Sequence, residues 1–299
     1  MRPEPGPHER RHGGDDCLDG LVALVTGGAQ GIGHATAVAC AKRGAAVALV
    51  DVDGPAAERA AAALGERLGV RTEWAAADVV DAAQVRAAVA RCAEALGGVD
   101  ILVNCAGIMT PRLALVADMP VEDVQRMFDV HVRGTFLFSQ AVLPGMQARG
   151  FGRIVNVSSV LGLLGLPYRS GYAIAKHAVN GFTKSLAVET ARQGITVNAV
   201  APGYILTETL QRRLDAGMLD YATYAERAPA GRWGLPEEIG HAIAFFASPA
   251  SGFVTGTVLP VDGGYTMRGD PNEAIGDALP IGALDALRAR FVSEPAGRS

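Results

Sequence analysis

Cysteine is scarce in this sequence, and the residues present form no recognisable ligand or redox pattern. Cys17, Cys40, Cys92 and Cys105 make neither a CxxC pair nor the spacing of metal ligands. The N-terminal region has no apolar stretch of the kind that a secretory signal carries. We therefore expect a protein of the reducing cytoplasm that holds no metal ion.

Long hydrophobic runs and clustered positive charge are also missing. No apolar run approaches the roughly 20 residues that a helix needs to cross a bilayer. Lysine and arginine are scattered and the formal net charge is -4, so no basic stripe is available to neutralise a phosphate backbone. We expect a soluble protein whose partners include neither membrane nor nucleic acid.

The length of 299 residues allows one substantial hydrophobic core but is short for two domains of average size. Residues 1–20 carry Pro, Gly, His, Arg and Asp without apolar periodicity, which is typical of a flexible arm. The alternation of strands and helices stops after Gly264, so residues 266–299 are expected to form a cap, an oligomer arm or a partly disordered extension. The expected domain spans residues 21–265.

Short β-branched or aliphatic runs alternate with longer Ala-rich stretches from Leu21 onward. Continuous apolar strands interleaved with helices indicate a parallel sheet that is covered on both faces. Proline and acidic residues mark two helix starts, at Pro120 to Asp123 and at Leu235 to Glu238. We expect an α/β fold with a single doubly wound parallel sheet of six to seven strands, flanked by helices on both faces.

A glycine-rich turn at Thr26 to Gly33 follows the first expected strand and runs into a helix expected to begin near His34. Glycine lets the backbone turn tightly and approach a pyrophosphate, and a helix N-terminus offers free N–H donors. Such turns also close ordinary strand–helix junctions, but here the next strand ends in an acid, Asp51. These features predict a Rossmann-type dinucleotide site. Its glycine turn contributes Gly27, Gln30, Gly31, Ile32 and Gly33.

Asp51 also decides the expected cofactor. A carboxylate at this position can accept hydrogen bonds from the adenosine ribose hydroxyls and would repel a 2'-phosphate. The glycine loop has Gln30 and no Arg or Lys that could attract that phosphate. NAD is therefore the predicted cofactor. Asp53 lies further into the loop and is the second choice for the ribose contact.

Several motifs, in this order and spacing, resemble those of the classical short-chain dehydrogenase/reductase family over roughly Leu21 to Tyr265. The glycine turn is similar to the family's TGxxxGxG, and Ser159, Tyr172 and Lys176 match its catalytic Ser and YxxxK. The resemblance implies an NAD-dependent oxidoreductase that interconverts a secondary alcohol and a ketone by hydride transfer. It also implies further cofactor contacts, at Asp78, Val79, Asn104, Ala106, Gly107, Pro202, Gly203, Ile205 and Thr207.

Tyr172 and Lys176 are four residues apart, so on a helix their side chains share one face. A free phenol titrates near roughly pH 10, and a neighbouring ammonium is expected to lower that pKa toward the range of a general acid/base. Lys176 is also expected to bind the nicotinamide ribose. Ser159 would polarise the substrate oxygen, and Ser158 would then be structural.

His131 is the main departure from the family pattern, which usually has Asn in the helix before the Ser strand. By resemblance that Asn holds a water linking the lysine to bulk solvent. An imidazole titrates near neutrality and can also bind a water, so His131 is a candidate for the proton relay. The alternative is a histidine that packs against the helix backbone. Cys105 replaces the second Asn of the family's NNAG, and a small buried thiol suits a strand end.

The substrate is expected beyond the carboxyl ends of the strands, between Val160–Tyr168 and Leu206–Pro229. The apolar residues of the second segment either form a lid over the substrate or pack on the domain. Arg169, Arg212 and Arg213 either meet an anionic group or lie on a solvated face. A modest-sized hydroxy or keto compound is favoured, and the resemblance implies a dimer or tetramer.

Two alternatives remain open at this stage. The motifs also resemble an NADP-dependent 3-oxoacyl thioester reductase, which a preference for NADPH would reveal. A non-catalytic dinucleotide-sensing protein would keep the fold without the chemistry. His131 is the feature that points to such a protein, while the intact Ser159, Tyr172 and Lys176 argue against it.

Overall fold

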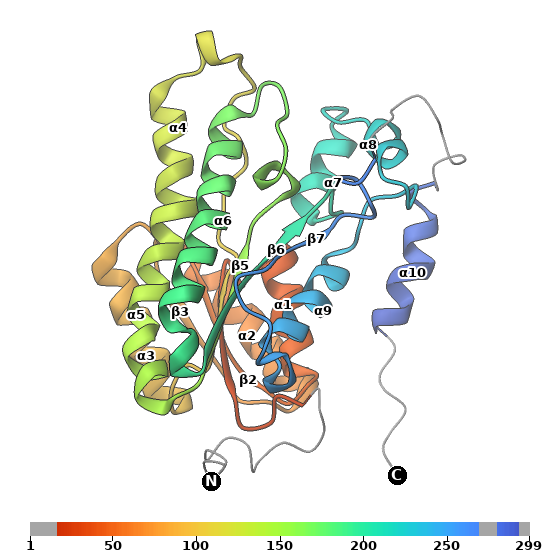
Figure 1. Cartoon of the computed structure of the whole chain (residues 1–299). Helices are drawn as coiled ribbons and strands as arrows, with labels where there is room; N and C mark the ends of the chain where they lie inside the picture. The colour runs from red at the N-terminus through yellow and green to blue at the C-terminus, as the bar shows by residue number, and fades with distance from the viewer. Residues whose placement is uncertain (1–16, 269–279, 293–299) are drawn as a thin grey trace.

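The fold is that of a computed structural model, which describes residues 17–268 and 280–292. Within them a seven-stranded sheet has the order β3-β2-β1-β4-β5-β6-β7, and every adjacent pair is parallel (Figure 1). The strands are β1 (Val22–Thr26), β2 (Ala46–Asp51), β3 (Thr72–Ala76), β4 (Ile101–Asn104), β5 (Gly152–Val157), β6 (Ile195–Pro202) and β7 (Val258–Val261). The doubly wound parallel sheet expected from the sequence is confirmed.

Helices cover both faces of this sheet. Successive side chains of a strand point to opposite faces, so Ala23 and Val25 of β1 enter one core while Val22 and Leu24 enter another. The first core lies under α1, α2 and α9, and the second under α3, α5 and α6. The helices are α1 (Gly31–Ala41), α2 (Gly54–Leu68), α3 (Ala82–Leu96), α4 (Val121–Phe128), α5 (Gly134–Arg149), α6 (Ser170–Thr190), α7 (Glu208–Asp215), α8 (Tyr221–Arg227), α9 (Pro236–Ala247) and α10 (Ala283–Val292).

The two helix starts expected from proline and acidic residues are confirmed. Pro120 is the N-cap of α4, and Pro236 opens α9 after Leu235. The first helix, α1, begins earlier than expected, at Gly31. The reason is that the N–H of His34 already donates to the carbonyl oxygen of Gln30 (3.2 Å), so the end of the glycine turn is itself the first helical turn.

The strand order reverses at β1, which pairs with β2 on one side and β4 on the other. The chain that leaves β1 enters α1 on one face of the sheet, whereas the chain that leaves β4 continues to α5 on the other face. Connections that diverge in this way open a crevice at the carboxyl ends of the strands, where α/β proteins bind ligands.

The arm expected at residues 1–20 lies mostly outside the described residues. Leu18, however, is fully buried beside Leu21, and its N–H donates to the carbonyl oxygen of Arg43 (2.7 Å). The packed part of the chain therefore includes residues before the expected boundary at residue 21.

Part of the extension expected at residues 266–299 folds back onto the domain, and the rest lies outside the described residues. Its helix α10 places Leu284 in a buried cluster with Leu206, Trp233 and Leu235. The described helix α10 thus caps its own chain, which is one of the three outcomes expected for this extension.

No helix within residues 17–268 and 280–292 is long and apolar enough to cross a membrane. In the same ranges no three His, Cys, Asp or Glu side chains gather as metal ligands. Cys17, Cys40, Cys92 and Cys105 are free thiols.

Candidate active site

The glycine-rich turn between β1 and α1 has the backbone shape that a diphosphate requires. Gly27 has a φ of +63° and Gly31 a φ of +56°, a region that favours glycine. A Cβ on Gly27 would lie 2.9 Å from the Cα of Ala106, and one on Gly33 would overlap the carbonyl oxygen of Gly27. Gln30 caps α1 without a side-chain hydrogen bond, which leaves the N–H groups of the first helical turn open to an anion.

Asp51 lies at the end of β2, beside this turn. Its Oδ2 accepts from the N–H of Ala29 (3.2 Å) and its Oδ1 from the N–H of Asp53 (3.2 Å), and both oxygens retain lone pairs for further donors. Asp53 caps α2 instead, with its Oδ1 accepting from the N–H of Ala56 (3.0 Å). Asp51 lines the crevice and is the better placed of the two acids.

A cavity of about 1110 Å³ runs along the crevice from Asp51 to Tyr172. It is large enough for a ligand of dinucleotide size. Its wall brings together most of the residues predicted from the sequence: Gly27, Gln30, Ile32, Gly33, Asp51, Asp78, Val79, Ala106, Gly107, His131, Ser159, Tyr172, Lys176, Pro202, Gly203, Ile205 and Thr207.

Two of the predicted cofactor residues do not line this cavity. Asn104 is buried at the end of β4, where its Nδ2 donates to Ser139 Oγ (3.2 Å) and Asn156 Oδ1 (2.9 Å). Its side chain ties β4 to β5 and α5, a role that motif spacing does not distinguish from ligand binding. Gly31 lines an adjoining cavity instead.

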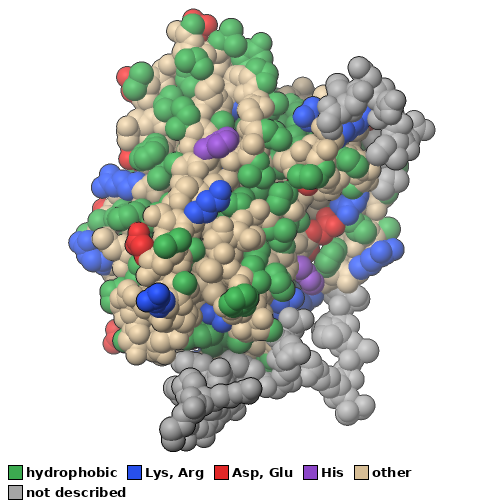
Figure 2. Space-filling model, in the orientation of Figure 1, with side chains coloured by type: hydrophobic (Ala, Val, Ile, Leu, Met, Phe, Trp, Pro, Cys, Tyr) green, Lys and Arg blue, Asp and Glu red, His purple; other side chains and the backbone are tan. Residues whose placement is uncertain are grey.

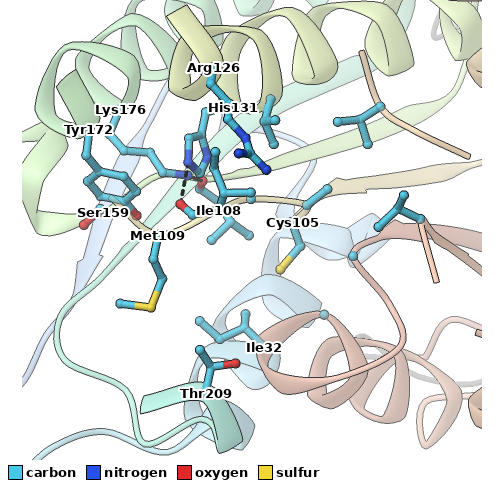
Figure 3. A pocket seen from close by; sticks show the side chains of 18 of the residues that line it. Ile32, Cys105, Ile108, Met109, Arg126, His131, Ser159, Tyr172, Lys176 and Thr209 are labelled. Carbon is cyan, nitrogen blue, oxygen red and sulfur yellow. Dashed lines mark hydrogen bonds between the residues drawn. The ribbon is translucent and has the colours of Figure 1, made fainter. Parts of the chain in front are cut away.

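Ser159, Tyr172 and Lys176 meet at one end of the main cavity (Figure 3). Ser159 follows β5, and its Oγ accepts from the N–H of Leu161 (3.2 Å). Tyr172 and Lys176 lie one turn apart on α6, with Lys176 Nζ 5.6 Å from the centre of the Tyr172 ring. The expected common face is confirmed. Ser158 Oγ donates to the carbonyl oxygen of Lys176 (3.4 Å), which suits a structural role.

The expected lowering of the Tyr172 pKa is wrong. Burial raises the pKa of this phenol to about 12, although its hydrogen bond with Ser159 and the charge of Arg169 act against the rise. The Lys176 ammonium does not offset the burial, because Nζ is turned toward β5 and donates to the carbonyl oxygen of Val157 (2.8 Å). Tyr172 therefore holds its proton at neutral pH, the state required of a proton donor.

Lys176 is a buried ammonium, only 5% exposed. Burial lowers its pKa to about 8, because the charged form loses its hydration. The neighbouring thiol of Cys105 also lines the cavity, and burial raises its pKa to about 12. Cys105 therefore stays protonated and is not a reactive thiolate.

His131 lies in η2 (Asp129–Arg133), a short π-helical turn between α4 and α5. Its Nε2 is 2.9 Å from the carbonyl oxygen of Ile108, so Nε2 carries the hydrogen and donates. Nδ1 is buried and has no hydrogen-bond partner in the described part of the chain. The ring packs edge-on against Tyr172, with ring centres 5.2 Å apart.

The expectation that His131 titrates near neutrality is wrong. Burial and the charge of Lys176 lower its pKa well below the ordinary value of 6.5. Only 3% of the residue is exposed. The imidazole is therefore neutral at physiological pH, with one nitrogen donating to Ile108 and the other available as an acceptor.

The first segment expected to border the substrate, Val160–Tyr168, does not line this cavity. Within Val160–Tyr168, Val160 and Leu161 are buried in a cluster with Ala228 and Tyr265. These residues pack beneath the site and support Tyr172, which contacts the same cluster.

The second segment, Leu206–Pro229, contributes only in part. Thr207, Thr209 and Leu210 line the main cavity. Most of its apolar side chains pack on the cluster around Trp233, which favours the second of the two roles considered for this segment. Arg212 is exposed and its Nε donates to the carbonyl oxygen of Glu208 (3.3 Å), as on a solvated face.

The cavity wall also contains residues that the sequence did not reveal. Figure 3 shows Met109 and Arg126 among them, with Arg126 on the far side of His131 from Tyr172. Ile108 and Met109 follow the strand-end motif of β4 directly, so their place at the crevice could have been inferred. No motif marks the residues of α4. The additional lining residues from these two segments are Ile108, Met109, Val121, Glu122, Gln125 and Arg126.

Comparison with known proteins agrees with this geometry. A family model described as enoyl-(acyl carrier protein) reductase matches residues 27–266. The cis-4-hydroxycyclohexanecarboxylate dehydrogenase of Sinomonas cyclohexanicum is 46% identical over 245 residues, which are 82% of this chain and 96% of that protein. The 3-oxoacyl-[acyl-carrier-protein] reductase of Vibrio cholerae is 42% identical over 250 residues, which are 84% of this chain and 99% of that protein.

Solved structures agree as well. The NADP-bound structure of ElxO superposes with a TM-score of 0.79 at 35% identity, over 83% of this chain and 99% of that chain. The family model, these relatives and the Ser159, Tyr172 and Lys176 set identify an oxidoreductase that acts on CH–OH groups with a nicotinamide dinucleotide. The chain belongs to the short-chain dehydrogenase/reductase family, in its classical form.

Proposed function

We propose that this protein is an NAD-dependent oxidoreductase that interconverts a secondary alcohol and a ketone, with Tyr172 as the general acid/base. The supporting observation is that one cavity joins the Asp51 carboxylate at one end to the hydroxyls of Ser159 and Tyr172 at the other. A non-catalytic dinucleotide sensor would need the first end only. We also propose that it works in the reducing cytoplasm, which suits its free cysteines.

The residues of the crevice fit a nicotinamide dinucleotide. The open N–H groups of the first turn of α1 would hold the diphosphate, and Asp51 would hold the adenosine ribose. Val79 and Asp78 would border the adenine, and the segment from Pro202 to Thr207 would hold the nicotinamide end. When bound, the nicotinamide ring supplies or accepts the hydride.

Tyr172, Ser159 and Lys176 would divide the proton chemistry. In ketone reduction the Tyr172 phenol, with a pKa of about 12, donates its proton to the carbonyl oxygen. The Ser159 hydroxyl donates a hydrogen bond to the same oxygen while negative charge develops there. Lys176 has a pKa of about 8 and is mostly charged at neutral pH. Its Nζ already donates to the carbonyl oxygen of Val157, and its ammonium would also bind the nicotinamide ribose.

His131 would continue the proton route behind Lys176. Its Nε2–H is occupied by the carbonyl oxygen of Ile108, whereas the lone pair of Nδ1 has no partner among the described residues. In this proposal Nδ1 accepts a hydrogen bond from a water that connects to Lys176. A neutral imidazole can serve as this acceptor across the physiological pH range.

Binding of NADH and NADPH to the purified protein tests the choice of cofactor. Because the Asp51 carboxylate repels a 2'-phosphate, we expect NADH to bind at least about tenfold more tightly. Asp51→Ser should reduce this preference. Asp53→Ala is the matched control, since Asp53 caps α2 and its loss should leave the preference unchanged.

A clear preference of the natural protein for NADPH would overturn the NAD assignment. It would favour the alternative, an NADP-dependent 3-oxoacyl thioester reductase, which the similarity to the Vibrio cholerae reductase supports. The similarity to a hydroxycyclohexanecarboxylate dehydrogenase instead supports a modest-sized hydroxy or keto compound as substrate.

A further inference from the structure

Arg169 is a half-buried cation close to the catalytic tyrosine. It is the N-cap residue of α6 and lies three positions before Tyr172. Its guanidinium forms no ion pair and no hydrogen bond with any described residue. Side chains of this kind usually have acceptors when they are partly buried. The five N–H donors of Arg169 are therefore available to an anion.

The groups around Arg169 carry positive charge and do not neutralise its guanidinium. The N-terminus of α6, a helix of 21 residues, carries a partial positive charge, and its first turn contains no acidic residue. A second cation, Arg227, lies over the ring of Tyr265, with its guanidinium carbon 4.8 Å from the ring centre. A cation at a helix N-terminus is unfavourable by itself, so an anion that binds here would relieve that cost.

An aromatic wall connects Arg169 to the active site. The ring centre of Tyr204 is 4.0 Å from that of Tyr224 and 5.8 Å from that of Tyr265. Tyr204 and Tyr265 pack in the same cluster as Tyr172. Burial raises the pKa of Tyr172, Tyr204 and Tyr265, and the charge of Arg169 opposes the rise at all three phenols.

Tyr204 also marks where this wall meets the catalytic cavity. Its two neighbours in the chain, Gly203 and Ile205, line the main cavity together with Ser159. Tyr204 and Arg169 are not among the residues that line this cavity, so they would meet a substrate that extends from Ser159 and Tyr172 past its wall.

The backbone before Arg169 is held in an unusual shape. Tyr168 has a φ of +66° and is the only non-glycine residue with positive φ in the described ranges. This conformation is unfavourable for a residue with a side chain, and such residues concentrate at functional sites. The turn sets the direction in which Arg169 enters α6.

We propose that Arg169 binds the carboxylate of the substrate, so that this enzyme acts on a hydroxycarboxylate and the corresponding oxocarboxylate. The inference rests on the proposed function, because Tyr172 and Ser159 are taken to hold the reacting oxygen. Residues three apart on a helix lie about 5–6 Å from each other. We therefore expect only a few carbon atoms between the carbinol carbon and the carboxylate. Tyr204, which is partly exposed, would contact the apolar carbons between them.

Turnover of matched acids and esters tests the proposal. The probes are 3-hydroxybutyrate, 4-hydroxycyclohexanecarboxylate and their methyl esters, each with NAD. The natural protein should prefer the acids. Arg169→Gln should lower the ratio of kcat/KM for the acids to kcat/KM for the esters by about 10- to 100-fold, the loss of a charge-assisted hydrogen bond. The ratio is compared because the charge of Arg169 also acts on the pKa of Tyr172, which affects acids and esters alike. Arg169→Lys should retain part of the preference for acids over esters. This result would show that the loss in Arg169→Gln comes from the missing charge and not from misfolding.

Two further arginines serve as comparisons. Arg192 follows the opposite end of α6 and is exposed, so Arg192→Gln should leave the preference unchanged. Arg126 lines the main cavity and is the competing cation. If Arg126→Gln removes the preference for acids and Arg169→Gln does not, the assignment to Arg169 is overturned.

A binding measurement separates this proposal from the proposed function. Calorimetry compares cyclohexanecarboxylate with cyclohexanecarboxamide, which requires no turnover. Binding of the carboxylate by the natural protein, lost in Arg169→Gln, supports the site even if no alcohol is oxidised. Oxidation of neutral alcohols with no preference for the carboxylate would overturn the Arg169 site and leave the oxidoreductase assignment standing.

Discussion

Lys176 is a charged residue whose burial is energetically unfavourable. It is almost fully buried, and its ammonium is satisfied by the carbonyl oxygen of Val157 rather than by a carboxylate. Burial lowers its pKa to about 8, so the folded protein binds the proton of Lys176 less tightly than the unfolded chain does. A residue with a proposed role in catalysis thus lowers stability.

This cost predicts a pH dependence of stability. Below about pH 8 Lys176 is charged in both the folded and the unfolded protein, so folding carries the full cost of burying the ammonium. Above about pH 10.5 Lys176 is neutral in both, and this cost is absent. Between these values the unfolded chain binds more protons, so stability should rise with pH. Relative to Lys176→Met, the free energy of unfolding of the natural protein should rise by up to about 3 kcal/mol. The measurement is denaturant unfolding of both proteins between about pH 8 and pH 10.5. A difference in unfolding free energy between them that stays constant with pH would contradict the prediction.

The positions of Ser159, Tyr172 and Lys176 could be predicted from the sequence, whereas their protonation could not. Spacing on a helix determines which side chains share a face. The pKa of Tyr172 depends instead on burial by residues distant in sequence and on the direction of Lys176 Nζ. The same holds for His131, which becomes neutral because it is enclosed beside Lys176.

At the scale of elements, α10 packs against the segment that follows β6 and keeps it in place. Leu284 of α10 is 2% exposed and packs with Leu206, which lies between the cavity residues Ile205 and Thr207. The end of α10 is also attached to α1, since Lys42 Nζ donates to the carbonyl oxygen of Phe291 (2.6 Å). α10 lies outside residues 27–266, which the family model matches.

Weakening this contact should affect ligand binding more than chemistry. Leu284→Ala leaves a cavity under α10 and should cost about 2–4 kcal/mol in the local packing. The segment from Ile205 to Thr207 is then less well held, so the KM for the dinucleotide should rise severalfold while kcat changes little. Ile281→Ala, at a position 38% exposed, is the control. A fall in kcat without a change in KM would contradict this role.

The sheet and the starts of α4 and α9 could be predicted because strand periodicity and proline caps are local signals. The helix α10 could not. Its stability comes from packing on Trp233 and Leu235, far away in the sequence, and the Gly, Pro and Asp residues of the tail obscure its pattern. A lid role of α7 and α8 cannot be decided from the sequence either, since periodicity does not tell which surface an apolar face contacts.

At the scale of the whole molecule, the face formed by α4, α5 and α6 exposes hydrophobic side chains to solvent. Phe136 is 48% exposed, Ile174 54% and Val188 83%, and Figure 2 shows hydrophobic side chains along the face that α4 and α6 present to the viewer. Exposed apolar side chains that gather on one face are typical of interaction surfaces. We propose that a second copy of the chain covers this face in a dimer or tetramer.

Sedimentation of the purified protein tests this assembly. The natural protein should sediment as a dimer or tetramer, and Val188→Glu should shift it toward smaller species because a charge would be buried at the contact. The exposed position of Val188 makes unfolding by this change improbable. A monomeric natural protein would contradict the proposal.

The ligand crevice could be predicted from the sequence, because the glycine turn after β1 and the acid at the end of β2 place the ligand at the carboxyl ends of the strands. The contribution of α4 to its wall could not, since it depends on the π-helical turn at His131, which has no sequence signature.

Tyr172→Phe tests the central claim most directly, because it removes only the phenolic hydroxyl from the assembled cavity. The measurement is turnover of an alcohol with NAD, followed by the absorbance of the reduced nicotinamide, beside NADH affinity. We predict that kcat falls by about 10²- to 10⁴-fold while NADH affinity stays within about threefold, since the ring is kept. Unchanged turnover in Tyr172→Phe would contradict the assignment of Tyr172 as the general acid/base.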